Sequence, residues 1–213
     1  MKKAKTLILS MIIGICLMLF VLLAVLANMN KQLQIDSFMF NMLGKISTKG
    51  VVNFFKILTA FGSIYALGVI ALSTFFLKNK IYGLTNCLVL GFSAVLCVVV
   101  KYIIRRPRPE VSHIEEVSYS FPSAHAMLTF VVLGFVIFIV IKHLKNKPLK
   151  IVMSSILAVL IVAIGLSRVL LGVHYFTDVL AGWVMATPIL VLGINFCNYL
   201  IKNHSKKINK MLM

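Results

Sequence analysis

The chain has 213 residues, of which 61% are hydrophobic and only 13% are charged, and its mean hydropathy is +1.02. A soluble domain is about 45–50% apolar and about 25% charged, so this composition excludes an ordinary soluble domain. The net charge is +17, which would ordinarily suggest nucleic acid as a partner. However, the basic residues lie mostly in short clusters between long apolar stretches, which is typical of a membrane protein with several spans and speaks against a nucleic-acid partner.

Six stretches are long and apolar enough to be membrane-spanning helices, since crossing the hydrocarbon core takes about 20 residues. They cover residues 6–27, 55–77, 81–100, 123–141, 149–166 and 179–201. The first resembles a secretory signal peptide, but its apolar run exceeds the usual length of about 7–15 residues, so we expect a retained anchor. The pattern predicts an all-α bundle of six transmembrane helices that forms a single membrane-embedded domain over residues 1–213.

Between the first two spans, apolar residues recur at the spacing of one helix face, while Asp36, Asn41 and Lys45 lie off that face. We expect an amphipathic helix in the membrane interface, and a helix that only packs on the bundle is the alternative. The apolar face consists of Ile35, Phe38, Met39, Met42, Leu43 and Ile46.

Charge predicts how the bundle is oriented in the membrane. With the N-terminus in the cytoplasm, thirteen of the 22 basic residues and none of the five acidic ones fall on the cytoplasmic side. These thirteen lie at the start of the chain and at 78–80, 142–150 and 202–210. By the positive-inside rule, both termini are cytoplasmic, and segments 101–122 and 167–178 face the other side.

The third span continues into a segment with four cations in eight residues, from Lys101 to Arg108. An interfacial anchor with snorkelling side chains is the simpler interpretation of such a cluster. However, Pro107 and Pro109 disfavour helical geometry at Arg106 and Arg108, and so fix the backbone where the cations lie. A rigid arginine fork suits bidentate binding of phosphate, to which a lysine adds a mobile point charge.

The fourth span begins at Pro122 and Ser123, which are typical residues for the start of a helix. We expect the backbone N–H groups of Ser123, Ala124 and His125 to be unpaired, and a helix N-terminus of this kind binds anions. Simple capping is the alternative role for Ser123. A histidine in the first turn of a membrane helix is rare and tends to be functional.

The last polar segment places His174 four residues before Asp178, with Arg168 just upstream. On a helical turn the two side chains share a face, so the carboxylate can accept a hydrogen bond from one ring nitrogen of the imidazole. That contact makes the other nitrogen a better nucleophile. Taken alone, such a pair is more often structural than catalytic.

Together the segments read Lys-x6-Arg-Pro, Pro-Ser-Ala-His and Ser-Arg-x5-His-x3-Asp, in that order and on one predicted membrane face. This resembles the type 2 phosphatidic acid phosphatase superfamily, the integral-membrane lipid phosphate phosphatases, and particularly its short six-span bacterial members. The motifs cover about 30 residues, and one departs from the usual pattern, because Ala124 replaces a glycine. Alanine is acceptable there if the residue is helical, but not if a left-handed conformation is required.

The resemblance implies a phosphohistidine mechanism, with His174 as nucleophile, Asp178 orienting it, and His125 as the acid that protonates the leaving oxygen and then activates water. It also implies that the phosphate is held by Lys101, Arg108, Ser123, Ala124 and Arg168. We expect no cofactor and no metal, because the acidic residues are few and scattered. The other charges of these segments, on Arg105, Arg106, Glu115 and Glu116, fall outside the motifs and are expected at the rim.

The expected substrate is a lipid phosphate in the bilayer, such as phosphatidylglycerol phosphate, undecaprenyl pyrophosphate or phosphatidic acid. Recycling of a cell-wall lipid carrier and phospholipid metabolism both fit. A transporter or lipid-binding protein that only holds an anionic head group is the main alternative, although the mid-span positions carry only mildly polar residues. A vanadate-dependent haloperoxidase has a similar anion pocket, but those relatives are soluble. No oligomeric state follows from the sequence.

Overall fold

The computed structural model describes residues 2–29, 32–110, 112–114 and 116–211, and all of its regular secondary structure is helical. This confirms the predicted all-α class. The helices are α1 (Lys2–Met29), α2 (Gln34–Gly44), α3 (Lys49–Ala60), α4 (Ile64–Ser73), the short 3-10 helix η1 (Thr74–Phe76), α5 (Ile81–Ile104), α6 (Ala124–His143), α7 (Lys147–Leu170) and α8 (Phe176–Met211).

Five helices, α1 and α5 to α8, are long and apolar enough to cross a membrane, and α3 with α4 and η1 supplies a sixth span if the bent pair is counted as one. The second predicted span therefore differs from expectation, because it bends by 47° near residues 61–63. Ser63 caps α4 by accepting a hydrogen bond from the Ala66 amide. Gly62 permits a close approach at the bend, since a Cβ there would lie 2.5 Å from Cγ2 of Ile164 and 3.2 Å from Cδ2 of His125.

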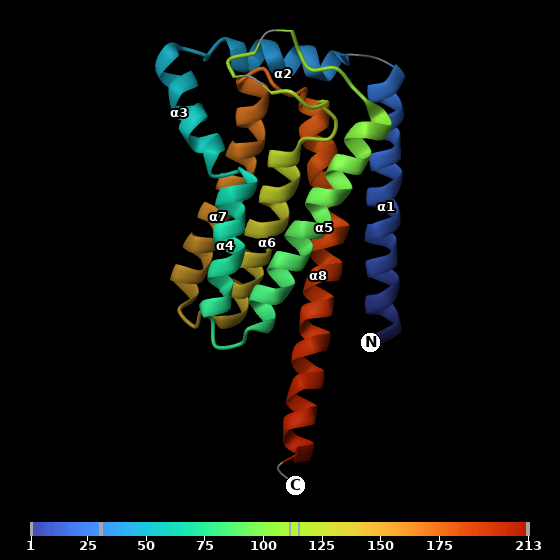
Figure 1. The fold of residues 1–213 in the computed structure, drawn as a ribbon, viewed down its shortest axis with the longest axis vertical. Coiled ribbons are helices and arrows are strands. Elements are labelled where there is room, and N and C mark those ends of the chain that lie inside the picture. Colours follow the sequence, from blue (N-terminus) through green and yellow to red (C-terminus); the bar gives the residue numbers. More distant parts are fainter. Residues whose placement is uncertain (1, 30–31, 111, 115, 212–213) are drawn as a thin grey trace.

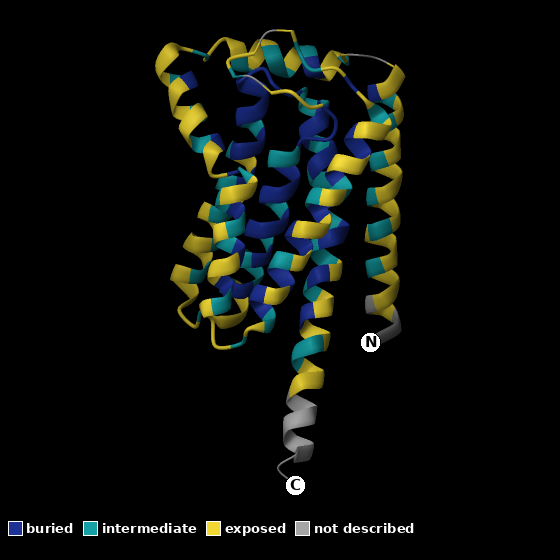
Figure 2. Ribbon diagram, in the orientation of Figure 1, coloured by how far each residue is buried: buried dark blue, intermediate teal, exposed yellow. Residues whose placement is uncertain are grey.

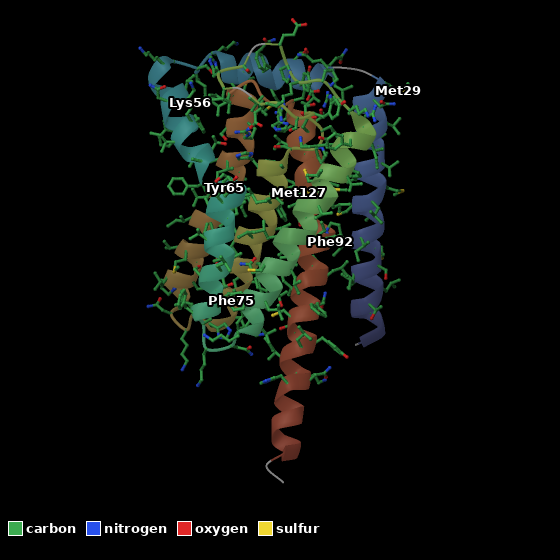
Figure 3. All side chains as sticks on the ribbon, viewed as in Figure 1. Met29, Lys56, Tyr65, Phe75, Phe92 and Met127 are labelled. Carbon is green, nitrogen blue, oxygen red and sulfur yellow. The ribbon has the colours of Figure 1, made fainter. Side chains whose placement is uncertain are left out.

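The centre of the bundle is α6, which packs against α4, α5, α7 and α8, while α1 lies along α8 (Figure 1). Buried residues gather in α6 and in the adjoining ends of α7 and α8 (Figure 2). Large apolar side chains cover the outer surface, and Figure 3 shows Tyr65 pointing away from the bundle, where it is 85% exposed. An apolar outer surface of this extent is suited to lipid.

Helix α2 lies across one end of the bundle, above the ends of α6, α7 and α8 (Figure 1). We call this the site end, because the 105–123 segment lies there too. Helix α1 begins and α8 ends at the opposite end. The predicted apolar face of α2 is divided, with Ile35, Phe38, Met42 and Ile46 exposed and Leu43 packed against buried residues of the α7 end.

Candidate active site

All three sequence motifs meet at the site end of the bundle. Lys101 belongs to the last turn of α5, which ends at Arg105 in the left-handed conformation (φ 52°). The chain then crosses the bundle to Ser123, the N-cap of α6. Arg168 belongs to the last turn of α7, and a short turn leads from there past His174 to Asp178 in the first turn of α8.

His174 is buried, with 2% of its surface exposed, and each ring nitrogen faces a charged neighbour. Nδ1 lies 3.3 Å from Oδ2 of Asp178, an oxygen that also accepts a hydrogen bond from the Tyr175 amide at 3.0 Å. Nε2 lies 3.3 Å from a guanidinium nitrogen of Arg108. Burial lowers the pKa of His174 well below its ordinary value of 6.5, and positive charges lower it further, on Lys101, Arg108 and Arg168. The imidazole is therefore held neutral, as a nucleophile requires.

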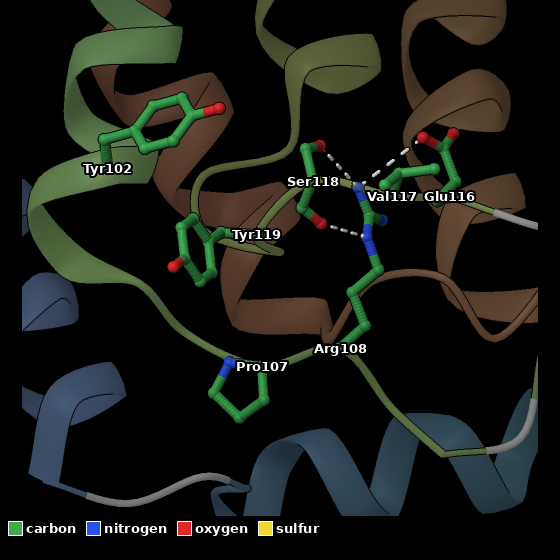
Figure 4. A pocket seen from close by; sticks show the side chains of 7 residues that line it. All are labelled: Tyr102, Pro107, Arg108, Glu116, Val117, Ser118 and Tyr119. Atoms are coloured by element: carbon green, nitrogen blue, oxygen red, sulfur yellow. Dashed lines mark hydrogen bonds and ion pairs between the residues drawn. The ribbon is translucent and has the colours of Figure 1, made fainter.

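Two of the cations near this histidine are held in place by backbone oxygens. Arg108 is fixed by the backbone oxygens of Ser118 (2.6 Å) and Val173 (2.7 Å), and Figure 4 shows the first of these bonds. Lys101 donates to the backbone oxygen of Ser120 at 3.3 Å and to that of Tyr119. These contacts hold the cationic groups in place before any phosphate arrives, and such preorganisation is what charge stabilisation in phosphoryl transfer requires.

Glu116 joins the two arginines of the site. One of its carboxylate oxygens lies 2.5 Å from Arg168. The other lies 3.5 Å from Arg108, a contact that Figure 4 shows. Its side chain is 28% exposed, so its expected position at the rim is correct. The contact with both phosphate-binding candidates was not foreseen, because nothing in the motif spacing distinguishes Glu116 from its neighbours. Arg168 is also held by Thr59 of α3 at 3.0 Å.

The start of α6 differs in one respect from the sequence prediction. The Ser123 amide is not open, since it donates to the backbone oxygen of Asp178 at 3.0 Å, and the Ser123 hydroxyl accepts from the Ala126 amide at 3.5 Å. Ala124 and His125 remain in the first turn, where backbone N–H groups have no acceptor within the helix. Ala124 does not adopt a positive φ, so alanine fits where the motif usually has glycine.

Two neighbouring cavities adjoin these groups and share Tyr102 and Ser118. One, of about 480 Å³, is lined by Arg108 and Glu116 and lies at the site end (Figure 4). The other, of about 340 Å³, lies between α4, α5 and α6 and is lined by Lys101, Ala124 and His125, with apolar residues deeper in the bundle. The predicted acid and two predicted phosphate ligands, Lys101 and Ala124, therefore line the same cavity.

Arg106 was expected at the rim, and this prediction is wrong. Its side chain is fully buried and lies between two carboxylates, 2.9 Å from Asp36 of α2 and 2.6 Å from Asp178. The chain reverses at Arg105, which is exposed as expected, and so directs the next side chain inward. Asp36 is likewise buried rather than on the polar outer face of α2. Glu115 lies outside the described residues.

In the described part of the chain, no three His, Cys, Asp or Glu side chains are grouped so that they could hold a metal ion. The chemical capacity of the site instead comes from a buried neutral imidazole next to a carboxylate, a second histidine at the end of a helix, and three cations. Such a set can bind a phosphate dianion and transfer its phosphoryl group to nitrogen.

Comparisons with known proteins identify a family for this chain. The model of the PAP2 superfamily matches residues 82–202. Phosphatidylglycerophosphatase B from Bacillus subtilis (strain 168) is 33% identical over 147 residues, which is 67% of this chain and 67% of that one. The crystal structure of the first transmembrane PAP2 type phosphatidylglycerolphosphate phosphatase from Bacillus subtilis superposes with a TM-score of 0.78 at 28% identity, covering 88% of this chain and 96% of that one. Aquifex aeolicus LpxE, at 22% identity and a TM-score of 0.57 over 73% of this chain and 90% of its own, is similar in fold.

Proposed function

Because the chain belongs to the PAP2 superfamily, we propose that it hydrolyses the phosphate group of a membrane lipid through a phosphohistidine intermediate. It is a multi-pass bacterial membrane protein and a phosphatase of that superfamily. One observation carries the proposed mechanism: His174 is buried with Nδ1 against Asp178, while Nε2 faces the guanidinium of Arg108.

In the first step, Nε2 of His174 attacks phosphorus and the bond between phosphorus and the lipid oxygen breaks. Asp178 stabilises the positive charge that develops on the ring. Three cations neutralise the phosphoryl oxygens, those of Lys101, Arg108 and Arg168, assisted by the backbone amide of Ala124 at the start of α6. His125 donates a proton to the departing lipid oxygen.

In the second step, His125 takes a proton from a water molecule, and the resulting hydroxide attacks phosphorus. The nitrogen–phosphorus bond breaks, inorganic phosphate leaves, and His174 is neutral again. Ser123 supports this step by capping α6, which keeps the amides of the first turn directed at the phosphate.

Phosphatidylglycerol phosphate is the proposed first substrate, since the Bacillus subtilis sequence match and the Bacillus subtilis structure match are both described as phosphatases of this lipid. The 340 Å³ cavity supports a lipid, because its lining changes from Lys101 and His125 to Ile64, Val98 and Leu128. The polar part suits a phosphate, and the apolar part suits the beginning of an acyl tail. Phosphatidic acid and undecaprenyl pyrophosphate present the same combination and are the substrates to compare.

We place the active site on the extracytoplasmic face, with both termini in the cytoplasm. The charge distribution favours this orientation, because the clusters of lysine without acidic residues all lie at the end opposite the site. The exposed apolar side chains of α2 would then rest in the interface beside the opening.

The test is release of inorganic phosphate by the full-length protein, purified in detergent, from each of the three lipids. The assay is run with and without a metal chelator, and the His174→Ala variant is the control. We expect turnover of phosphatidylglycerol phosphate that persists with chelator and disappears in the variant. Equal phosphate release by the variant would refute the mechanism, and loss of activity with chelator would refute metal independence.

A further inference from the structure

Asp36, Arg106 and Asp178 form a buried chain of charges that connects α2 to the active site. The guanidinium of Arg106 donates to Oδ2 of Asp36 at 2.9 Å and, through its other terminal nitrogen, to Oδ1 of Asp178 at 2.6 Å. All three side chains are at most 1% exposed. The three residues come from α2, from the segment after α5 and from α8.

The contacts leave little freedom for any member of this chain of charges. The guanidinium carbon of Arg106 lies 4.1 Å from the centre of the Tyr175 ring. Asp36 also accepts hydrogen bonds from the backbone amide of Thr177 at 2.8 Å and from its hydroxyl at 3.0 Å. A buried charge is costly unless it is paired and hydrogen-bonded, so neither carboxylate can turn away from Arg106 without losing a partner.

The consequence for Asp178 is that both of its oxygens are occupied. Oδ1 is held by Arg106, and Oδ2 is held by the Tyr175 amide and faces Nδ1 of His174. The plane of the carboxylate, and with it the direction in which the imidazole is held, depends on the position of Arg106. Asp36 in turn fixes that position from the other side.

Asp36 also limits how strongly Arg106 acts on Asp178. One guanidinium serves two carboxylates, so its positive charge is shared between them. If Asp36 were neutral, Arg106 would neutralise Asp178 more fully. Asp178 would then stabilise less of the positive charge that forms on His174 during attack.

We propose that Asp36, acting through Arg106, is a positioning residue for Asp178 and therefore sets the orientation and reactivity of the nucleophile His174. This inference rests on the proposed function, because it assigns Asp36 and Arg106 a part in the same phosphohistidine reaction. It gives a role to a residue of α2 that lies outside every catalytic motif.

A purely structural role of Asp36 would also explain its buried ion pair with Arg106. A double-mutant cycle distinguishes this structural role from the positioning role. Asp36→Asn keeps the shape of the side chain and an oxygen for the Thr177 amide but removes the charge. If Asp36 acts through Asp178, then Asp36→Asn has no further effect on kcat once Asp178 has been changed. If Asp36 has an independent structural role, the two substitutions lower kcat by factors that multiply in the double variant.

The experiment measures kcat and KM on phosphatidylglycerol phosphate for Asp36→Asn, Asp178→Asn and the double variant, each full length and in detergent. We expect Asp36→Asn to lower kcat by roughly ten- to hundredfold, as for other outer-shell partners that orient a functional histidine. KM should change less than about twofold, because Asp36 does not touch the phosphate site. The double variant should be no slower than Asp178→Asn alone.

Glu110→Gln is the matched control, since it removes the same charge from an exposed position in the segment after α5, and it should behave like the unmodified protein. If Asp36→Asn does not fold, Arg106→Lys takes its place in the cycle, because one ammonium keeps the charge but does not reproduce the guanidinium fork. A kcat within about twofold of the unmodified protein, or multiplying effects in the double variant, would overturn the proposal.

A second measurement separates failure of this inference from failure of the proposed function. In histidine-labelled protein, the ¹⁵N signals of His174 should move in Asp36→Asn and stay in place in Glu110→Gln, whether or not lipid is hydrolysed. Unchanged signals in Asp36→Asn would refute the positioning role even in an active enzyme. Absence of phosphate release from every lipid by the unmodified protein would refute the proposed function alone.

Discussion

A guanidinium nitrogen of Arg108 lies 3.3 Å from Nε2 of His174. Arginine only donates hydrogen bonds, so this contact is favourable when Nε2 carries a lone pair and the proton is on Nδ1, directed at Asp178. The same arginine is a candidate ligand of the phosphate. The lone pair that attacks and the cation that binds are therefore neighbours before the substrate arrives.

The first prediction concerns the nucleophile. His174→Ala should lower turnover by more than about a thousandfold and abolish any acid-labile phosphoenzyme, because the attacking atom is lost. Asp178→Asn should be less severe, since it removes orientation and charge stabilisation only. Quench experiments with ³²P-labelled lipid measure both quantities. Phosphate release above a few per cent of the unmodified rate in His174→Ala would show that another group attacks.

The second prediction separates the two histidines. His125→Ala should slow turnover by roughly a hundredfold or more. If hydrolysis of the intermediate becomes rate-limiting, labelled phosphoenzyme should accumulate in this variant but not in His174→Ala. The same quench experiment measures the amount of labelled phosphoenzyme in each variant. Labelled intermediate in the His174 variant, and never in the His125 variant, would reverse the assigned roles.

The third prediction follows from the carboxylate that joins Arg108 and Arg168. Glu116 occupies both guanidinium groups where the phosphate is expected, so the substrate must compete with it. Glu116→Gln should lower KM and the inhibition constant for inorganic phosphate by roughly two- to fivefold, the range that a partly exposed ion pair of up to about 1 kcal/mol allows. Steady-state kinetics with Glu110→Gln as control measures this. A raised KM would instead mean that Glu116 orients the arginines productively.

The fourth prediction concerns protonation of the nucleophile. Burial and nearby cations lower the pKa of His174. His174 should therefore still be neutral at pH 6.5, where an ordinary histidine is half protonated. Titration of histidine-labelled protein by ¹⁵N NMR, with His174→Ala to assign the signal, should show the Nδ1–H tautomer persisting at pH 6.5. Half-protonation at or above pH 6.5 would contradict this, as would the opposite tautomer, with the proton on Nε2.

The fifth prediction concerns the side of the membrane. Ser112→Cys at the site end should react with a membrane-impermeant thiol reagent in intact cells, whereas Lys145→Cys at the opposite end should not, in a background without the four native cysteines. Both positions are exposed. Retained lipid phosphatase activity shows that the variants fold. Labelling at 145 alone would place the active site in the cytoplasm.

The composition and motifs were sufficient to predict the all-α class, the spans and the convergence of the motif residues at one end. Charged residues within membrane-spanning segments are rare and costly, so their positions are informative. The bend near Gly62 was not predictable, since the apolar run continues through it and the reason for the glycine is a close approach to Ile164.

The inward position of Arg106 was also hidden from the sequence. Three arginines lie within four residues, and nothing in the sequence distinguishes the exposed Arg105 and the partly buried Arg108 from the fully buried Arg106. Its partner Asp36 is 70 residues away, in a helix whose polar residues looked solvent-facing. Pairings over such a distance depend on tertiary packing, which local periodicity does not reveal.

The buried carboxylate of Asp36 has a consequence for the biogenesis of the protein. Asp36 precedes Arg106 by 70 residues and Thr177 by 141, so during synthesis it reaches the membrane long before its partners exist. Asp36 can complete its hydrogen bonds only after α8 has been inserted and has brought Thr177 and Asp178 to the site end. Helix α8 thus supplies the last partners of a side chain in α2. A chain released before α8 can keep the contact of Leu43 with the end of α7, but the carboxylate of Asp36 lacks the hydrogen bonds from Thr177.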